Sequence, residues 1–90
     1  MARAIVDPAE LRRFATSLKH FTSELAHQIA VVQGQFGGLG DTWRDQEHEK
    51  FAQEFTETVQ VLARFIESAQ QHVPYLLRKA DRIEEYLSQR

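Results

Sequence analysis

The residues best suited to chemistry in this 90-residue chain are histidines and carboxylates spaced along helical segments. His20, Glu24 and His27 stand at i, i+4 and i+7, so a helix would place them near one face, where imidazole and carboxylate groups can hold a transition metal. Solvated polar residues beside an apolar stripe give the same spacing, and this is the commoner origin of such a pattern. We therefore predict no metal and no cofactor.

The acidic residues of the central segment raise a second chemical possibility. Asp45, Glu47 and Glu49 lie close enough in sequence for paired-carboxylate chemistry, but they also fall where a helix is expected to begin, and acids there stabilise the helix dipole. His48 and His72 stand among charged residues with no partner group nearby in sequence. No phosphate-binding loop, serine elbow or cofactor fingerprint is present. The sequence predicts that the protein is not an enzyme.

Composition excludes several other classes of protein. The chain has no cysteine, which excludes disulfides and thiol chemistry, and its net charge of −2 gives no basic surface for nucleic acid. No apolar run approaches the roughly 18 residues that a membrane span needs. The first eleven residues lack the apolar core of a Sec-type signal peptide. We expect a protein that is cytosolic or exported by a route without such a peptide.

A first helix is predicted from about residue 8 to 37. Asp7, Pro8 and Glu10 form an N-cap, a first-turn proline and the second half of a capping box. All four glycines lie between residues 34 and 40, so we expect a turn at 38–41 in which glycine supplies a positive φ. The apolar positions of this helix recur at steps of three and four: Leu11, Phe14, Leu18, Phe21, Leu25, Ile29, Val32 and Phe36.

A second, longer helix is predicted from about residue 42 to 88, with Asp41 or Thr42 as its N-cap. Pro74 removes one backbone hydrogen bond, which allows either a kink or a break, and the absence of an N-cap or glycine before it favours a kink. The apolar set is broad: Phe51, Phe55, Val59, Leu62, Phe65, Ile66, Ala69, Val73, Leu76, Leu77, Ala80, Ile83 and Leu87.

These elements predict an all-α fold, an antiparallel two-helix hairpin in a single domain over residues 1–90. A turn at 38–41 would place residue 8 opposite residue 72, leaving residues 75–88 without a neighbouring helix. Because a two-helix hairpin buries little, we expect a dimer with a four-helix core. The predicted helix–helix interface consists of Leu18, Phe21, Leu25, Ile29, Phe55, Leu62, Phe65 and Ile66.

The segment around the turn resembles the WXG family of early-secreted-antigen-like proteins. Its pattern places an aliphatic residue four before a tryptophan, a glycine two after it and an aromatic eight after it. Leu39, Trp43 and Phe51 match these positions, and Asp45 stands in place of the glycine. Length, central turn and the lack of a Sec-type signal agree as well.

This resemblance implies a helical hairpin that pairs as a homodimer or with another WXG-like protein. It also implies a substrate of a type VII (ESX-like) secretion system, with a secretion ATPase as a possible partner. Many members carry a tail signal of tyrosine followed four residues later by Asp or Glu. Here Tyr75 is followed four residues later by Lys79, and the pair most similar to the signal is Leu77 followed by Asp81, with leucine in place of tyrosine. If this altered signal does not function, the protein is expected to stay in the cytoplasm.

Two alternatives remain open from the sequence. The wide apolar face of the second helix and the missing tail tyrosine also suit a cytosolic coiled-coil adaptor or small chaperone that binds a partner helix. An amphipathic protein on a membrane surface fits less well, because acidic residues are interspersed with the basic ones. Trp43 itself either plugs the tip of the hairpin or also contacts a partner, and the two roles are compatible.

Overall fold

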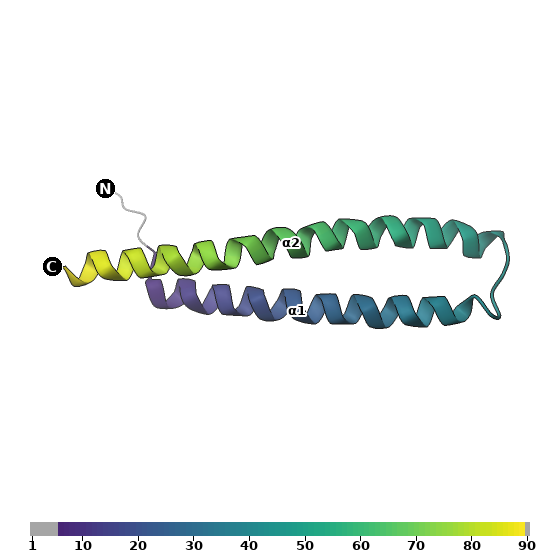
Figure 1. Ribbon diagram of the computed structural model, residues 1–90, viewed down its shortest axis with the longest axis horizontal. Helices are drawn as coiled ribbons and strands as arrows, with labels where there is room; N and C mark the ends of the chain where they lie inside the picture. The colour runs from purple at the N-terminus through teal and green to yellow at the C-terminus, as the bar shows by residue number, and fades with distance from the viewer. Residues whose placement is uncertain (1–5, 90) are drawn as a thin grey trace.

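The protein is an elongated antiparallel hairpin of two long helices. The computed structural model describes residues 6–89, with α1 at Pro8–Leu39 and α2 at Gln46–Ser88, and no strand occurs in this range. The molecule measures 68 × 23 × 15 Å, and the two helices lie side by side along its length (Figure 1). The predicted all-α hairpin is confirmed. The domain prediction also covers residues 1–5 and 90, and the signal-peptide prediction rests partly on residues 1–5; these residues lie outside the described range.

The start of α1 follows the sequence pattern. The carboxylate of Asp7 accepts a hydrogen bond from the backbone N–H of Ala9 at 2.9 Å, and Pro8 occupies the first helical turn. The Asp7 carboxylate thus provides a partner for the Ala9 N–H, which has none within the helix. Pro8 has no backbone N–H, so its position in the first turn leaves no donor without a partner. Neither helix contains a window long and apolar enough to cross a membrane.

At the C-terminal end of α1, the glycines do not form the turn that the sequence predicted. Gly34, Gly37 and Gly38 lie inside the helix, which ends at Leu39, and Gly40 caps it with φ −59°. No glycine in the described range has a positive φ, so the predicted left-handed turn is wrong. The chain instead leaves the helix through short bonds of the i→i+3 type, such as Gly40 N–H to the Gly37 carbonyl at 3.3 Å.

The second helix begins later than Asp41 or Thr42, and these two residues are not its N-cap. Asp45 takes that position, where its carboxylate accepts a hydrogen bond from the His48 N–H at 3.0 Å. The Thr42 hydroxyl turns back toward the Leu39 carbonyl, so it is not available to α2. Residues 40–45 therefore form the connection between the helices, rather than residues 38–41.

The later start of α2 shifts the register of the hairpin. Arg12 pairs with Asp81 and Glu84, and Lys19 and Ser23 face Pro74 and neighbouring residues across a groove. The prediction that residues 75–88 lack a neighbouring helix is therefore wrong up to Glu84, whereas the last turn of α2 extends beyond the start of α1 (Figure 1). Moving the centre of the connection by about three residues moves the opposing position by about six, and the long side chain of Arg12 carries the contact further along α2.

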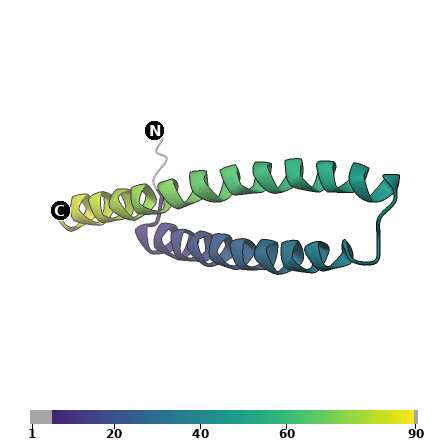
Figure 2. The same cartoon turned by 45° about the vertical axis from the view of Figure 1, so that its right-hand side comes forward.

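Helix α2 continues through Pro74 without a break. The proline lies inside the helix and removes only the bond that would join its N–H to the Gln70 carbonyl. Figure 2 shows α2 bending gently as it passes from the tip toward the open end.

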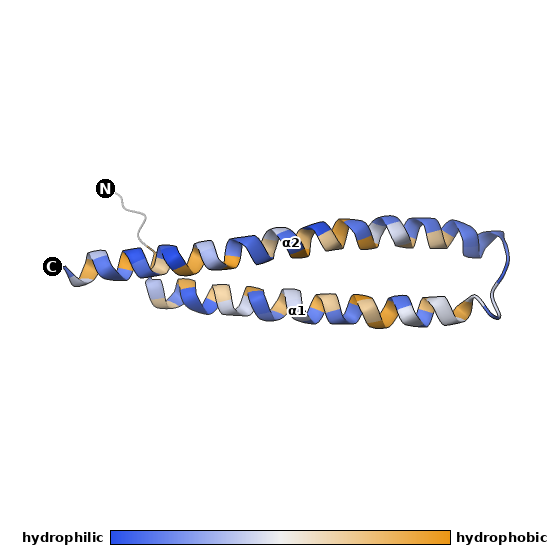
Figure 3. Cartoon of the chain, viewed as in Figure 1, coloured by the Kyte–Doolittle hydropathy of each residue, from blue (hydrophilic) through white to orange (hydrophobic). Residues whose placement is uncertain are grey.

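The core of the hairpin is thin. Its buried apolar residues are small: Ala15, Ala69, Val73 and Ala80. Of these, Ala15 and Ala80 have no exposed surface. Apolar positions recur along both ribbons (Figure 3), yet about half of the large apolar side chains in residues 6–89 keep more than a third of their surface exposed. A single chain therefore leaves much of its apolar surface uncovered.

Candidate functional site

An aromatic cluster closes the tip of the hairpin. The His48 ring stacks on Phe36, with ring centroids 5.0 Å apart and planes at 9°, and Trp43 meets the His48 ring edge-on, also at 5.0 Å. Phe36 also contacts Phe51 at 5.4 Å and Phe55 at 5.2 Å. Stacked and edge-to-face rings at these separations add stability beyond area burial. Trp43 thus covers the tip from the connection, and we call these five residues the tip cluster.

His48 is the member of this cluster that the sequence analysis missed. We expected it to stand alone among charges, but it lies half-buried between Phe36 and Trp43. The missed signal is its spacing, because His48, Phe51 and Phe55 stand at i, i+3 and i+7 and share one helical face.

The aspartate that replaces the motif glycine has a structural role. Because Asp45 is the N-cap of α2, its side chain satisfies an N–H of the first turn. Glycine is also accepted at N-caps, at a cost of only a few tenths of a kcal/mol relative to aspartate. The two residues are therefore nearly interchangeable here. Leu39 and Phe51, the other motif positions beside Trp43, are 47% and 44% exposed.

A second feature is an apolar face shared by the two helices. Phe14 and Phe21 of α1 are 57% and 53% exposed, and Val61 and Phe65 of α2 are 55% and 45% exposed. Phe21 and Phe65 meet edge-to-face at 6.2 Å, which places the exposed side chains of both helices on one side of the hairpin. We call these four residues the aromatic face. Beside it, the other predicted interface residues are half-buried: Leu18, Leu25, Ile29, Phe55, Leu62 and Ile66.

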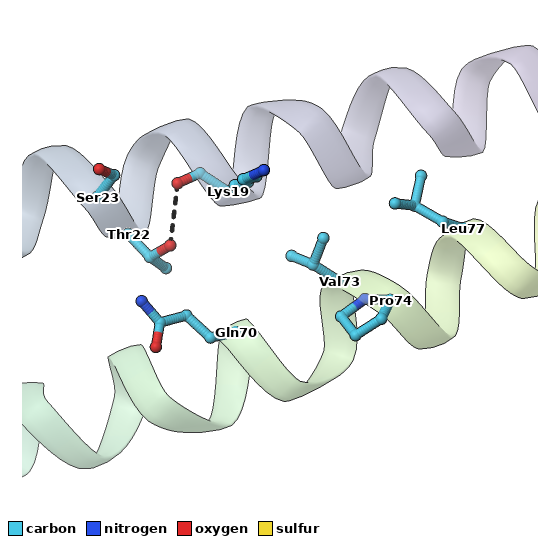
Figure 4. Close-up of a pocket in the computed structure, with 7 residues that line it drawn as sticks. All are labelled: Lys19, Thr22, Ser23, Gln70, Val73, Pro74 and Leu77. Atoms are coloured by element: carbon cyan, nitrogen blue, oxygen red, sulfur yellow. Dashed lines mark hydrogen bonds between the residues drawn. The ribbon is translucent and has the colours of Figure 1, made fainter.

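A groove of about 500 Å³ runs between the helices near Pro74 (Figure 4). Lys19, Thr22 and Ser23 line one wall, and residues of α2 from Gln70 to Leu77 line the other. The Thr22 hydroxyl, which is 1% exposed, donates to the Lys19 carbonyl at 3.1 Å, so this buried polar group is satisfied.

Ion pairs link the two helices at the open end of the hairpin, where α1 begins and α2 ends. One Arg12 nitrogen lies 2.6 Å from a Glu84 carboxylate oxygen and 2.8 Å from one of Asp81. The hydrogen bonds that Arg12 donates to these two carboxylates, the one to Glu84 first, raise the pKa of Arg12 above its usual range. Leu77 and Asp81 are the two residues most similar to the tail signal. They lie on the part of α2 that is next to the first turns of α1. Leu77 is 37% exposed, and the Asp81 side chain is 69% exposed.

The residues considered for metal chemistry do not converge. Within residues 6–89, no three His, Asp or Glu side chains are arranged to hold a metal ion, which includes His20, Glu24 and His27. The tip cluster and the aromatic face, by contrast, hold apolar side chains that are about half exposed, such as Phe51 and Phe65.

A class of protein follows from this geometry and from comparison with known sequences. Residues 4–86 match the WXG100 family, described as proteins of 100 residues with WXG. The chain therefore belongs to the WXG100 family, with Trp-Arg-Asp at residues 43–45 where the family name has Trp-X-Gly. No curated protein matches the chain.

Solved structures share the fold over nearly the whole chain. The selenomethionine-labelled crystal structure of the secreted protein ESXB from Bacillus anthracis str. Sterne is 28% identical, with a TM-score of 0.76, and the match covers 96% of this chain and 98% of that one. The wild-type protein in the P21 space group gives 28% identity and a TM-score of 0.75, with coverage of 93% and 97%.

Proposed function

We propose that this protein is a small, non-enzymatic substrate of a type VII (ESX-like) secretion system and that it acts as a paired helical hairpin. The observation that carries the proposal is the family match over residues 4–86, together with the similarity to a secreted protein. Pairing is supported by the aromatic face. Its side chains are about half exposed, so a second protein that covers them would remove a large apolar area from water and stabilise the complex. The other chain is either an identical hairpin or a related one.

Export is tested directly in the native host. We expect the protein in the culture supernatant, and we expect it to remain in the cell lysate when the secretion ATPase is deleted. A cytosolic marker measured in the same fractions controls for lysis. Retention in the lysate of the intact host would contradict export and would favour the cytosolic adaptor.

Trp43 offers a way to separate folding from export. We expect Trp43→Phe to keep the helical circular dichroism and the mass of the paired species, because phenylalanine still packs on His48. We expect the amount exported to fall several-fold, because the larger indole surface at the tip is available to the secretion machinery. Asp45→Gly is the matched control, and it should leave export unchanged. Wild-type export of Trp43→Phe would restrict the tryptophan to closing the tip.

We place the tail element at Leu77 and Asp81, whose side chains are partly exposed near the open end. Leu77→Ala removes the apolar half of this element and is expected to lower export several-fold without changing pairing. The control is Tyr86→Ala, since that tyrosine, 63% exposed, has no acidic residue four positions later. Equal export of the two variants would show that Leu77 is not part of a signal.

A further inference from the structure

The groove near Pro74 opens on the side of the hairpin that faces away from the aromatic face. At about 100° per residue, Lys19 and Ser23 project roughly 140 to 180° from the two aromatic-face residues of α1. Gln70 and Pro74 project by the same roughly 140 to 180° from the aromatic-face residues of α2. A molecule that covers the aromatic face therefore leaves this groove open to a further partner.

Lys19 brings a positive charge to the groove without a carboxylate beside it. Its side chain is exposed, and its neighbours three and four positions away on the helix are uncharged: Ala15, Thr16, Thr22 and Ser23. The α2 residues that line the groove are uncharged as well: Gln70, Val73, Pro74 and Leu77. The ion pairs found within residues 6–89 belong to Arg12. The groove is therefore complementary in charge to an anion.

The wall formed by α2 adds a hydrogen-bond acceptor and an apolar surface. Pro74 has no N–H, so the Gln70 carbonyl lacks the donor that the helix would otherwise supply. Val73 and Leu77 point toward α1 and form the apolar part of the groove (Figure 4). A cation, a carbonyl acceptor and an apolar surface thus lie together along about two turns of α2.

We propose that this groove binds the C-terminal end of a partner peptide whose last residue is apolar. The α-carboxylate of that residue pairs with the Lys19 ammonium group, and its backbone N–H donates a hydrogen bond to the Gln70 carbonyl. Its side chain covers Val73 and Leu77. The groove volume of about 500 Å³ lies within the roughly 300 to 1,000 Å³ that is usual for ligand sites.

A chain end fits these groups because it carries an anion, a donor and an apolar side chain on one residue. An internal acidic residue has a carboxylate but no apolar side chain of its own, and a fatty acid has no N–H to donate. Recognition of a terminal carboxylate is an established mode of peptide binding in other proteins. The inference goes beyond the secretion role and does not depend on it.

The probe is N-acetyl-leucine, which carries the carboxylate, the N–H and the apolar side chain of a chain end. Its binding to the full ¹⁵N-labelled chain is followed by NMR. We expect saturable shifts of the amide signals of residues 19–23 and 70–77, with a dissociation constant on the order of 1 mM for so small a ligand. N-acetyl-leucine amide, which lacks the carboxylate, should bind about fivefold more weakly, as an exposed ion pair predicts.

Two variants test the two polar contacts separately. Lys19→Gln removes the positive charge and should raise the dissociation constant of N-acetyl-leucine about fivefold, leaving that of the amide unchanged. Pro74→Ala restores an N–H that occupies the Gln70 carbonyl, so it should weaken binding of both compounds while raising the melting temperature. Lys50→Gln is the matched control, because Lys50 is exposed on α2 about 36 Å from Pro74 along the helix, and it should bind the probe like the wild type.

Equal binding of N-acetyl-leucine and its amide would overturn the inference, as would a Lys19→Gln variant that binds the probe like Lys50→Gln. The absence of saturable shifts at residues 70–77 would do the same. Octanoate has the carboxylate and an apolar chain but no N–H, and we expect it to bind more weakly than N-acetyl-leucine. Octanoate that binds as tightly as N-acetyl-leucine would assign the groove to acyl chains and contradict a peptide end.

Discussion

Phe36→Ala is expected to lower the free energy of unfolding by about 3 kcal/mol. Phe36 is half-buried and is the central ring of the tip cluster, in contact with His48, Phe51 and Phe55. Truncation of a phenylalanine in a core costs roughly 3 to 5 kcal/mol, and partial exposure moves the expected value to the low end. Since small proteins are stable by about 5 to 15 kcal/mol, this is a large share.

The measurement is urea denaturation at one fixed protein concentration, because pairing makes stability depend on concentration. Trp43 is the only tryptophan of the chain, so its fluorescence also reports the tip directly. Phe36→Leu is the control, since it keeps most of the apolar volume and should cost about 1 kcal/mol. A loss below 1 kcal/mol for Phe36→Ala would show that the tip contributes little to the fold.

The helices could be predicted from the sequence because their signals are local. Asp7 and Pro8 mark a helix start, and steps of three and four define the apolar stripes without any knowledge of the partner helix. The location of Trp43 near the turn was also evident. Its contact with Phe51, at 6.2 Å between ring centroids, needed the structure.

The turn and the register could not be predicted in the same way. Gly37 and Gly38 were expected to end α1, but glycine is only about 1 kcal/mol less favourable than alanine in a helix. The contacts of the neighbouring Phe36 with Phe51 and Phe55 of α2 outweigh such a preference, and α1 continues to Leu39. The choice of Asp45 over Asp41 as N-cap then fixed the register, and with it the pairing of Arg12 with Glu84. A small local error thus became a displacement of several residues at the open end.

The sequence indicated which apolar residues form the stripe of each helix, but it did not show which of them are buried between the helices and which are exposed. Phe21 and Phe65 were expected to contribute to helix packing, and they do touch, yet each keeps about half of its surface exposed. The buried centre belongs to small residues, because α-helices can approach closely only where side chains are short. Periodicity gives the width of a stripe and leaves open which edge of it faces the neighbouring helix.

Ala80→Leu should be the most damaging change at the open end. Ala80 and Ala15 have no exposed surface, and Arg12 pairs with Asp81 at the same level, so α1 and α2 are close together here. A leucine adds three carbon atoms where no space is available, and such overpacking costs about 1 to 3 kcal/mol. We expect the helices to separate at this end and the ion pairs of Arg12 to break.

Amide hydrogen exchange distinguishes this local effect from general unfolding. Protection should fall most for residues 11–19 of α1, which face the altered segment, and least around Phe36 at the tip. Ala30→Leu is the matched control, because Ala30 is exposed and the same added atoms there meet solvent. If Ala80→Leu proved as stable and as well protected as Ala30→Leu, the close approach at Ala15 and Ala80 would be wrong. The register set by Arg12 with Asp81 and Glu84 would then have to be reassigned.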